Sequence, residues 1–322
     1  MNHFKNFIKN LPYLKEIIEE RDKLFQLNNK LTIDLNVWKK GFVPPGHFYS
    51  PLPDIDLINQ CQKEVFSKTD SIPLSINLNE NDQLDLLSNF AEFYSEFPFK
   101  KYSTDNYRYY LDNDFYAYSD GVCLYSMMRY LKPKKFIEVG SGFSSCAALD
   151  TAELFFKELP EFTFIEPFPE RLLGLLKPSD LNNQKINICQ SIVQDISLKT
   201  FESLEKNDIL FIDSSHVCKT GSDVNFLFFE VFPRLKPGVH IHIHDIFFPF
   251  EYPLSWMLEG RSWNEIYLLR SFLEYNDSFK IVYFNNYMEV IHKDEVLANI
   301  PLCLTNPTNK TTIPGSIWLK KE

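Results

Sequence analysis

The sequence predicts an α/β fold in which a seven-stranded, mostly parallel sheet carries helices on both faces, after an α-rich N-terminal cap. Two observations lead to this prediction. From residue 116 onward, short apolar runs alternate with helical patterns, as in parallel sheets whose strands are joined by helical crossovers. The first run stops in the turn Gly140-Ser141-Gly142, which lacks a Cβ at two positions and leads into a helix. We expect free backbone N–H groups in this turn.

The N-terminal segment has apolar side chains at three- and four-residue steps over residues 4–37, the pattern of amphipathic helices, interrupted near Pro12. Such helices either cover their own domain or contact a second copy of the chain in a homo-oligomer. A proline-rich loop spans 43–54, and a helical pattern returns over 80–97. We divide the chain into a helical N-terminal cap, residues 1–115, and an α/β domain, residues 116–322.

The α/β domain opens with a helical pattern over 119–131 and then alternates between strands and helices. A helix over 223–235 ends in the stop signal Lys236-Pro237-Gly238, and a later one covers 265–275. The predicted strands span residues 135–139, 162–166, 185–190, 208–213, 239–245, 279–284 and 316–320.

The composition excludes several classes of protein. A formal net charge of −10 argues against a general nucleic-acid surface. The six cysteines show no Cys-x-x-Cys pairing, which indicates neither a zinc ribbon nor a disulfide framework but free thiols. No apolar block is long enough for a signal peptide or a membrane span. We therefore expect a cytoplasmic protein.

Acidic residues lie where the predicted parallel strands end, which is where open α/β sheets bind ligands: Glu138, Glu166, Asp213 and Asp245. A dinucleotide site would need a third glycine where Ser145 stands, and Glu138 would repel a pyrophosphate. The turn also lacks the Lys or Arg of a phosphate-binding loop. S-adenosylmethionine fits better, because it carries an ammonium and a sulfonium and no phosphate.

Five segments in order resemble class I S-adenosylmethionine-dependent methyltransferases. The resemblance is closest to the small-molecule or sugar O-methyltransferase-like branch, of the methyltransferase family 24 type, that is associated with surface-polysaccharide or secondary-metabolite clusters. It covers roughly residues 106–320 and implies a Rossmann-like sheet whose last strand is antiparallel. The segments are Phe136–Ser145, Phe164–Pro167, Asp208–Asp223, Leu235–Ile246 and Pro314–Trp318.

The resemblance implies that the turn and the strand ends bind the cofactor. The implied contacts are Glu138, Gly140, Ser141 and Gly142 to the methionine part, Glu166 to the ribose, Asp195 to the adenine, and Asp213 beneath the sulfonium.

Methyl transfer to oxygen needs an aligned acceptor and a base. His216, just past the fourth strand, is our first candidate base, with Asp213 and His244 as further catalytic candidates. Asp213 and Asp245 stand where metal-dependent methyltransferases hold Mg²⁺, although a second Asp or Asn after the fifth strand is missing. A histidine ligand would favour a transition metal. The alternative is a metal-free acid–base pair of His216 and His244.

An aromatic and charged segment follows the fifth strand and contains Tyr252, Trp256 and Arg261, which we predict to bind the acceptor. Aromatic stacking with a few polar groups suits a small-molecule or sugar acceptor. The sequence therefore predicts an S-adenosylmethionine-dependent methyltransferase acting on a hydroxyl group. A non-catalytic relative that binds a nucleotide or a partner, and a NAD-dependent oxidoreductase, are the alternatives.

Overall fold

The computed structural model describes residues 12–38, 41–62, 66, 73–309 and 312–322. The chain divides into two units, Met1–Val65 and Phe66–Glu322, so residues 80–115, which we assigned to the N-terminal cap, belong to the same unit as the sheet. The first unit contains the helices α2 (Pro12–Trp38) and α3 (Ile55–Gln60). The helical pattern before Pro12 lies outside the described residues. None of the described helices combines the length and the apolar character needed to cross a membrane.

The second unit is built on a seven-stranded sheet with the strand order β3-β2-β1-β4-β5-β7-β6. Six strands run in one direction, and β7 is antiparallel to both of its neighbours, β5 and β6, which confirms the predicted fold class. Every predicted strand lies within one residue of the observed bounds at each end. The strands are β1 (Lys135–Val139), β2 (Glu161–Ile165), β3 (Ile186–Cys189), β4 (Ile209–Ile212), β5 (His240–His244), β6 (Phe279–Phe284) and β7 (Ser316–Lys321).

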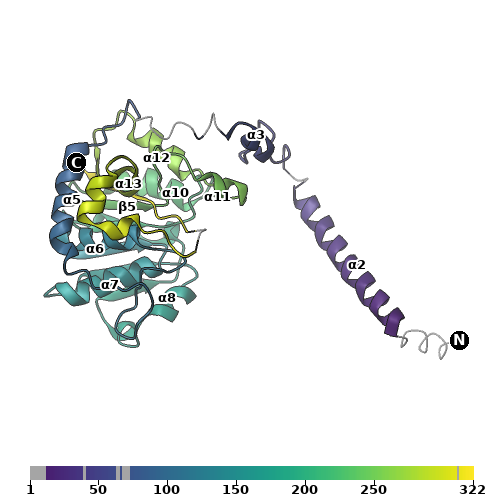
Figure 1. Cartoon of the computed structure of the whole chain (residues 1–322), viewed down its shortest axis with the longest axis horizontal. Coiled ribbons are helices and arrows are strands. Elements are labelled where there is room, and N and C mark those ends of the chain that lie inside the picture. The colour runs from purple at the N-terminus through teal and green to yellow at the C-terminus, as the bar shows by residue number, and fades with distance from the viewer. Residues whose placement is uncertain (1–11, 39–40, 63–65, 67–72, 310–311) are drawn as a thin grey trace. The chain divides into compact units, whose positions relative to one another are not determined.

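Both faces of the central sheet are covered. Every residue of β4 and β5 is buried, and successive side chains of a strand point to opposite faces, so helices must lie on each side. Helices α5, α6 and α7 pack beside one another (Figure 1). The helical elements of this unit are α5 (Glu80–Tyr94), α6 (Ser119–Leu131), α7 (Phe143–Phe155), α8 (Glu170–Leu175), η1 (Asp180–Asn182), η2 (Val193–Asp195), α9 (Leu198–Glu202), α10 (Asp223–Phe226), η3 (Leu227–Val231), η4 (Phe232–Arg234), α11 (Leu254–Leu258), α12 (Glu265–Leu273), α13 (Asn285–Ile291), α14 (Lys293–Asn299) and η5 (Pro301–Leu304).

The helix predicted over 223–235 is not a uniform α-helix. It begins as α10, continues as the π-helical segment η3 and ends as the 3-10 turn η4. Pro233 lies at the start of η4 and has no N–H to donate to the preceding turn. The hydrogen-bonding pattern therefore changes ahead of the proline.

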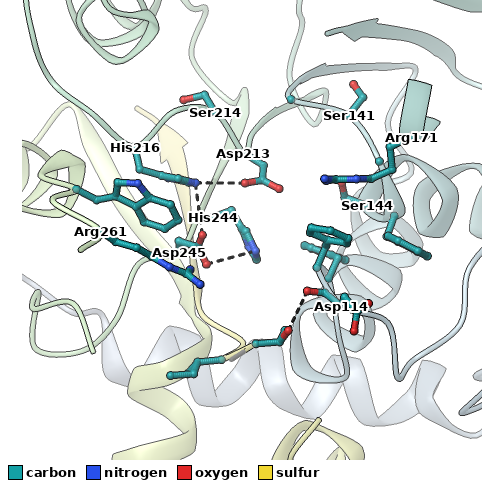
Figure 2. Close-up of a pocket in the computed structure, with 18 of the residues that line it drawn as sticks. Asp114, Ser141, Ser144, Arg171, Asp213, Ser214, His216, His244, Asp245 and Arg261 are labelled. Carbon is teal, nitrogen blue, oxygen red and sulfur yellow. Dashed lines mark hydrogen bonds and ion pairs between the residues drawn. The ribbon is translucent and has the colours of Figure 1, made fainter. Parts of the chain in front are cut away.

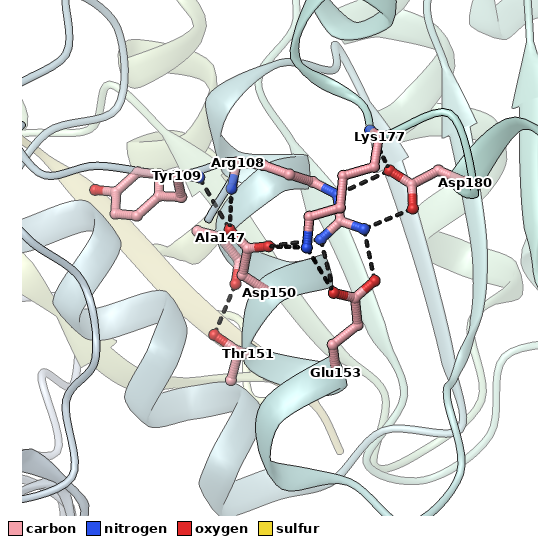
Figure 3. A network of polar contacts seen from close by, with 8 residues as sticks. All are labelled: Arg108, Tyr109, Ala147, Asp150, Thr151, Glu153, Lys177 and Asp180. Atoms are coloured by element: carbon pink, nitrogen blue, oxygen red, sulfur yellow. Dashed lines mark hydrogen bonds and ion pairs between the residues drawn. The ribbon is translucent and has the colours of Figure 1, made fainter. Parts of the chain in front are cut away.

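A buried arginine fixes the segment before α6 to the rest of the unit (Figure 3). The guanidinium of Arg108 donates to Asp150 Oδ1 at 2.5 Å, to Glu153 Oε1 at 2.5 Å and to Asp180 Oδ2 at 2.8 Å. Asp150 Oδ2 also accepts the backbone N–H groups of Arg108 and Tyr109, at 2.7 and 2.9 Å. This network holds the chain that leads to residues 114–116 against α7, at the carboxyl edge of the sheet.

Candidate functional site

The turn after β1 brings the ends of two strands together. Gly140 has a positive φ of 82°, and a Cβ at this position would lie 1.7 Å from the carbonyl oxygen of Asp213. Asp213 in turn donates its N–H to Val139 O at 2.9 Å. Only glycine permits this approach, so the residues that follow β1 and β4 form one continuous wall.

The backbone N–H groups of the turn are not free, so our expectation for them was wrong. Each is used within the protein, because the end of β2, the loop after it and the first turn of α7 provide acceptors that the sequence did not reveal. The acceptors are Ile165 O for Gly140 at 3.0 Å, Glu166 Oε2 for Ser141 at 3.2 Å, and Ser145 Oγ for Gly142 at 3.0 Å. Ser145, which replaces the third glycine of a dinucleotide motif, is therefore part of the turn's own support.

Glu138 lies beneath the turn and does not line the cavity described below. Its carboxyl group accepts hydrogen bonds from Ser144 Oγ and, at 2.5 Å, from Ser145 Oγ. Burial raises the pKa of Glu138 to about 8. At neutral pH the group is therefore uncharged and supports the turn, in contrast to the predicted contact with a cationic ligand.

Two cavities open at the carboxyl edge of the sheet, with volumes of about 670 and 480 Å³. Both are lined by Gly140, Glu166, Asp213 and Ser214. Ser141 and Gly142, two of the predicted cofactor contacts, line the larger cavity. The smaller cavity has Phe168, Ile192 and Gln194 in its wall. Asp195, the predicted adenine contact, is exposed and lines neither of them.

A cluster of one histidine and two carboxylates lines the larger cavity (Figure 2). His216 Nε2 lies 3.4 Å from Asp213 Oδ1 and 3.4 Å from Asp245 Oδ2. One donor atom from each of these three side chains lies within 4.8 Å of the other two. The predicted site residues at the ends of β4 and β5 are thus brought together, with His216 between the carboxylates.

The carboxylates determine the charge of His216. Burial alone would lower the pKa of His216, but the contacts with Asp213, Glu265 and Asp245 outweigh it and raise this pKa well above its ordinary value. Burial alone would raise the pKa of Asp213, yet the His244 and His216 rings bring it below the ordinary value. With only protein groups around it, His216 holds a proton at neutral pH and is a poor base.

The orientation of His216 is set by the start of α12. Its Nδ1 lies 2.9 Å from Glu265 Oε2, and Glu265 is fully buried. The carbonyl oxygen of His216 accepts the N–H groups of Asn264 at 3.0 Å and Glu265 at 3.1 Å. The residue has a positive φ of 58°, so the loop turns sharply here and directs Nε2 toward the cavity. The other candidate, His244, also lines the cavity, and its Nε2 lies 3.5 Å from Asp245 Oδ1.

The far wall of the larger cavity contains Trp256, Arg261 and Trp263. The Arg261 guanidinium lies 4.3 Å from the ring centroid of Trp256 and 5.2 Å from that of Trp263, and Arg261 pairs with Glu259 at 3.0 Å. Tyr252, the third predicted acceptor residue, is buried behind this wall, does not line the cavity, and packs edge-on against Trp263.

The sequence reasoning placed Trp263 in the acceptor segment but missed three other residues of this site: Phe115, Arg171 and Glu265. Phe115 and Arg171 line the larger cavity, and Glu265 holds His216. Arg171 follows Glu166 by five residues, a spacing that could have identified it. The others come from segments that only the folded chain brings to the strand ends.

Residues 137–246 match the family model of a methyltransferase domain. An uncharacterized protein of Archaeoglobus fulgidus is 32% identical over 181 residues, which cover 55% of this chain and 80% of that protein.

Solved structures with a similar fold include the O-methyltransferase TomG from Streptomyces achromogenes in complex with S-adenosylmethionine, at 12% identity and a TM-score of 0.41, covering 81% of this chain and 96% of that one. An O-methyltransferase from Bacillus cereus in complex with S-adenosylhomocysteine has 13% identity and a TM-score of 0.41, with coverage of 83% and 100%.

The family match covers β1 to β5, the same strands whose carboxyl ends form the two cavities. It supports neither the NAD-dependent oxidoreductase nor the non-catalytic alternative. Residues 137–246 therefore form a methyltransferase domain of this family, and the protein is identified as an S-adenosylmethionine-dependent methyltransferase.

Proposed function

We propose that this enzyme methylates a hydroxyl group of a small molecule or sugar, with a divalent cation held by Asp213, His216 and Asp245. The observation that carries the proposal is the convergence of these three donor groups on a cavity that the glycine turn also lines. We also propose a cytoplasmic location, because all six cysteines are free thiols.

S-adenosylmethionine, when bound, supplies the electrophilic methyl group. The paired cavities support a division of the cofactor between them. Phe168 and Ile192 offer apolar surface for the adenine ring in the smaller cavity, and Glu166, in the wall of both, suits the ribose hydroxyls. Ser141 and Gly142 then face the methionine part in the larger cavity.

The three side chains at the cavity fit a divalent cation in type as well as in spacing. They offer two carboxylate oxygens and one imidazole nitrogen, and this mixed set suits manganese, iron or zinc better than magnesium. Glu265 accepts from Nδ1 of His216, which leaves Nε2 as the ligand atom. A bound cation would orient the acceptor oxygen and lower the pKa of its hydroxyl group.

His216 is therefore a ligand in this proposal and not the base that we first considered. Its ring holds a proton when only carboxylates surround it, and its Nε2 is occupied when a cation is bound. His244 remains as the proposed proton acceptor, because its ring lines the same cavity beside Asp245. Trp256, Trp263 and Arg261 would hold the acceptor, stacking on a sugar or phenolic ring.

Three measurements test the proposal. Calorimetry should show binding of S-adenosylhomocysteine and not of NAD; the reverse result would contradict it. Transfer of a labelled methyl group from S-adenosylmethionine to a panel of phenolic and sugar hydroxyls should be lost with EDTA and restored by Mn²⁺.

His216→Ala should abolish Mn²⁺ binding, whereas Glu259→Gln, at the exposed rim, should leave it intact. Activity that resists EDTA would favour the metal-free His216 and His244 pair.

We further propose that α2 pairs with α2 of a second copy. Ile17, Leu24 and Leu31 recur at seven-residue spacing with 44%, 60% and 57% of their surface exposed, an apolar stripe suited to a helical pair. Leu24→Glu should reduce the molar mass in light scattering to that of a monomer, and Gln26→Glu, off the stripe, should not. A monomeric wild-type protein would contradict the proposal.

A further inference from the structure

Arg171, in the first turn of α8, lines the larger cavity beside the glycine turn. Its guanidinium carbon lies 3.6 Å from the ring centroid of Phe115, so the charged group rests on an aromatic face. Its Cδ lies 3.4 Å from the position that a Cβ of Gly142 would take. A ligand that lies against the turn is therefore within reach of this side chain.

The guanidinium of Arg171 forms no ion pair with any of the residues that the structure describes, within 4.0 Å. The two other arginines discussed above differ in this respect, since Arg108 is paired with three carboxylates and Arg261 with Glu259. A cation that faces a cavity with no carboxylate within 4.0 Å among the described residues is suited to bind an anionic group of a ligand.

The backbone N–H groups of the turn cannot supply the donors for such a group. Those of Gly140, Ser141 and Gly142 already donate to Ile165, Glu166 and Ser145. An anionic group placed at the turn therefore needs side-chain donors, and Arg171 is the cationic side chain that lines the cavity on this side.

We propose that Arg171, supported by Phe115, binds the α-carboxylate of the methionine part of the cofactor. This inference rests on the proposed division of S-adenosylmethionine between the two cavities. It assigns the amino-acid end of the cofactor to the wall formed by α8 and residue 115, and it leaves Arg261, on the opposite wall, for the acceptor.

The test compares two ligands that share an adenosine and a thioether. S-adenosylhomocysteine carries the amino-acid carboxylate, and 5′-methylthioadenosine lacks it. For Arg171→Gln, calorimetry should show an affinity for S-adenosylhomocysteine that is about 10- to 100-fold lower, the usual effect of losing a charge-assisted hydrogen bond. The affinity for methylthioadenosine should stay within about twofold of the wild-type value. Arg171→Lys keeps the charge but not the planar fork. Its affinity for S-adenosylhomocysteine should lie between those of the wild type and Arg171→Gln.

Arg234→Gln serves as the matched control, because this exposed arginine lines neither cavity, and it should leave both affinities unchanged. The inference is overturned if Arg171→Gln binds S-adenosylhomocysteine as tightly as the wild type, or if both ligands weaken equally. A wild-type protein that binds methylthioadenosine but not S-adenosylhomocysteine would also overturn it. If the wild type binds neither ligand, the proposed cofactor itself is wrong, which separates the two failures.

Discussion

Arg108 and His216 are each surrounded by three carboxylates, but the two clusters differ in where the carboxylates point. Asp150, Glu153 and Asp180 all contact the Arg108 guanidinium at 2.5 to 2.8 Å, and none of these residues lines either cavity of the site (Figure 3). Around His216 only Glu265 is at a normal hydrogen-bonding distance.

The other two carboxylates of the His216 cluster, Asp213 and Asp245, lie 3.4 Å from Nε2 and face the larger cavity (Figure 2). A buried charge cluster with all of its donors paired at short distance stabilises the fold. A cluster whose ligand atoms face a cavity at longer distance retains capacity for a ligand. Burial and composition alone do not separate these cases.

The largest expected effect tests the structural role of the Arg108 cluster. Arg108→Ala leaves three carboxylates without their cation and should lower the free energy of unfolding by about 3–5 kcal/mol, measured by urea denaturation. His216→Ala should cost less than half as much, because Asp213 and Asp245 face the cavity. Equal losses for the two variants would remove the distinction between the clusters.

The second prediction concerns the support of His216 in the other cluster. Glu265→Gln keeps an acceptor for Nδ1 but removes the charge that makes the imidazole a stronger ligand. We expect the affinity for Mn²⁺ to fall by about 10- to 100-fold in calorimetry, with little change in stability. An unchanged affinity would mean that Glu265 only packs in the core.

Glu138 extends the comparison to a buried carboxyl group without a cation. Its pKa of about 8 in the folded protein exceeds the ordinary value of 4.5, so between these pH values the folded state holds more protons than the unfolded chain. Stability from this group is therefore lost as the pH rises, by up to about 1.4 kcal/mol per pH unit.

Glu138→Gln removes this titration. Between pH 5.5 and pH 7.5, the unfolding free energy of the wild type should therefore fall relative to that of the variant. Parallel pH profiles for the two proteins would show that Glu138 is ionised when folded.

The smallest expected effect lies at the rim of the Arg108 cluster. Lys177 Nζ is 3.1 Å from Glu153 Oε2, and 37% of its side chain is exposed. Lys177→Met should lower the free energy of unfolding by at most about 1 kcal/mol, since water and salt screen an exposed pair. A loss as large as that for Arg108→Ala would show that the two cations act as one unit.

The sequence predicted the sheet almost completely, because the strands of a sheet buried on both faces are short apolar runs that stop at glycine or acidic residues. The division at residue 115 differs from the observed units, since the 80–94 helix packs on α6 and the sheet, a contact between segments far apart in the chain. The strand-end rule also located Asp213, His216 and Asp245.

The rest of the site depends on tertiary packing that a linear pattern does not contain. Glu265 reaches His216 only because α12 begins beside the loop after β4. Tyr252 belongs to the predicted segment, but its side chain points into the core. The sequence could not predict this, because an aromatic residue type does not indicate which way its side chain points. Glu138 was given a charge because its burial was not evident from a single strand position.

The N–H groups of Asn264 and Glu265 donate to the His216 carbonyl and so join the loop after β4 to the segment that carries Trp256 and Arg261, the residues proposed to bind the acceptor. Some positions of this segment can therefore change when acceptor preference evolves, and others cannot. Trp256 and Arg261 are free to diverge as acceptors change, while positions 264 and 265 must keep their backbone geometry for His216 to remain in place. An insertion or deletion between residues 256 and 264 that altered acceptor preference would also displace His216. A point substitution in this segment would alter acceptor preference and leave His216 in place.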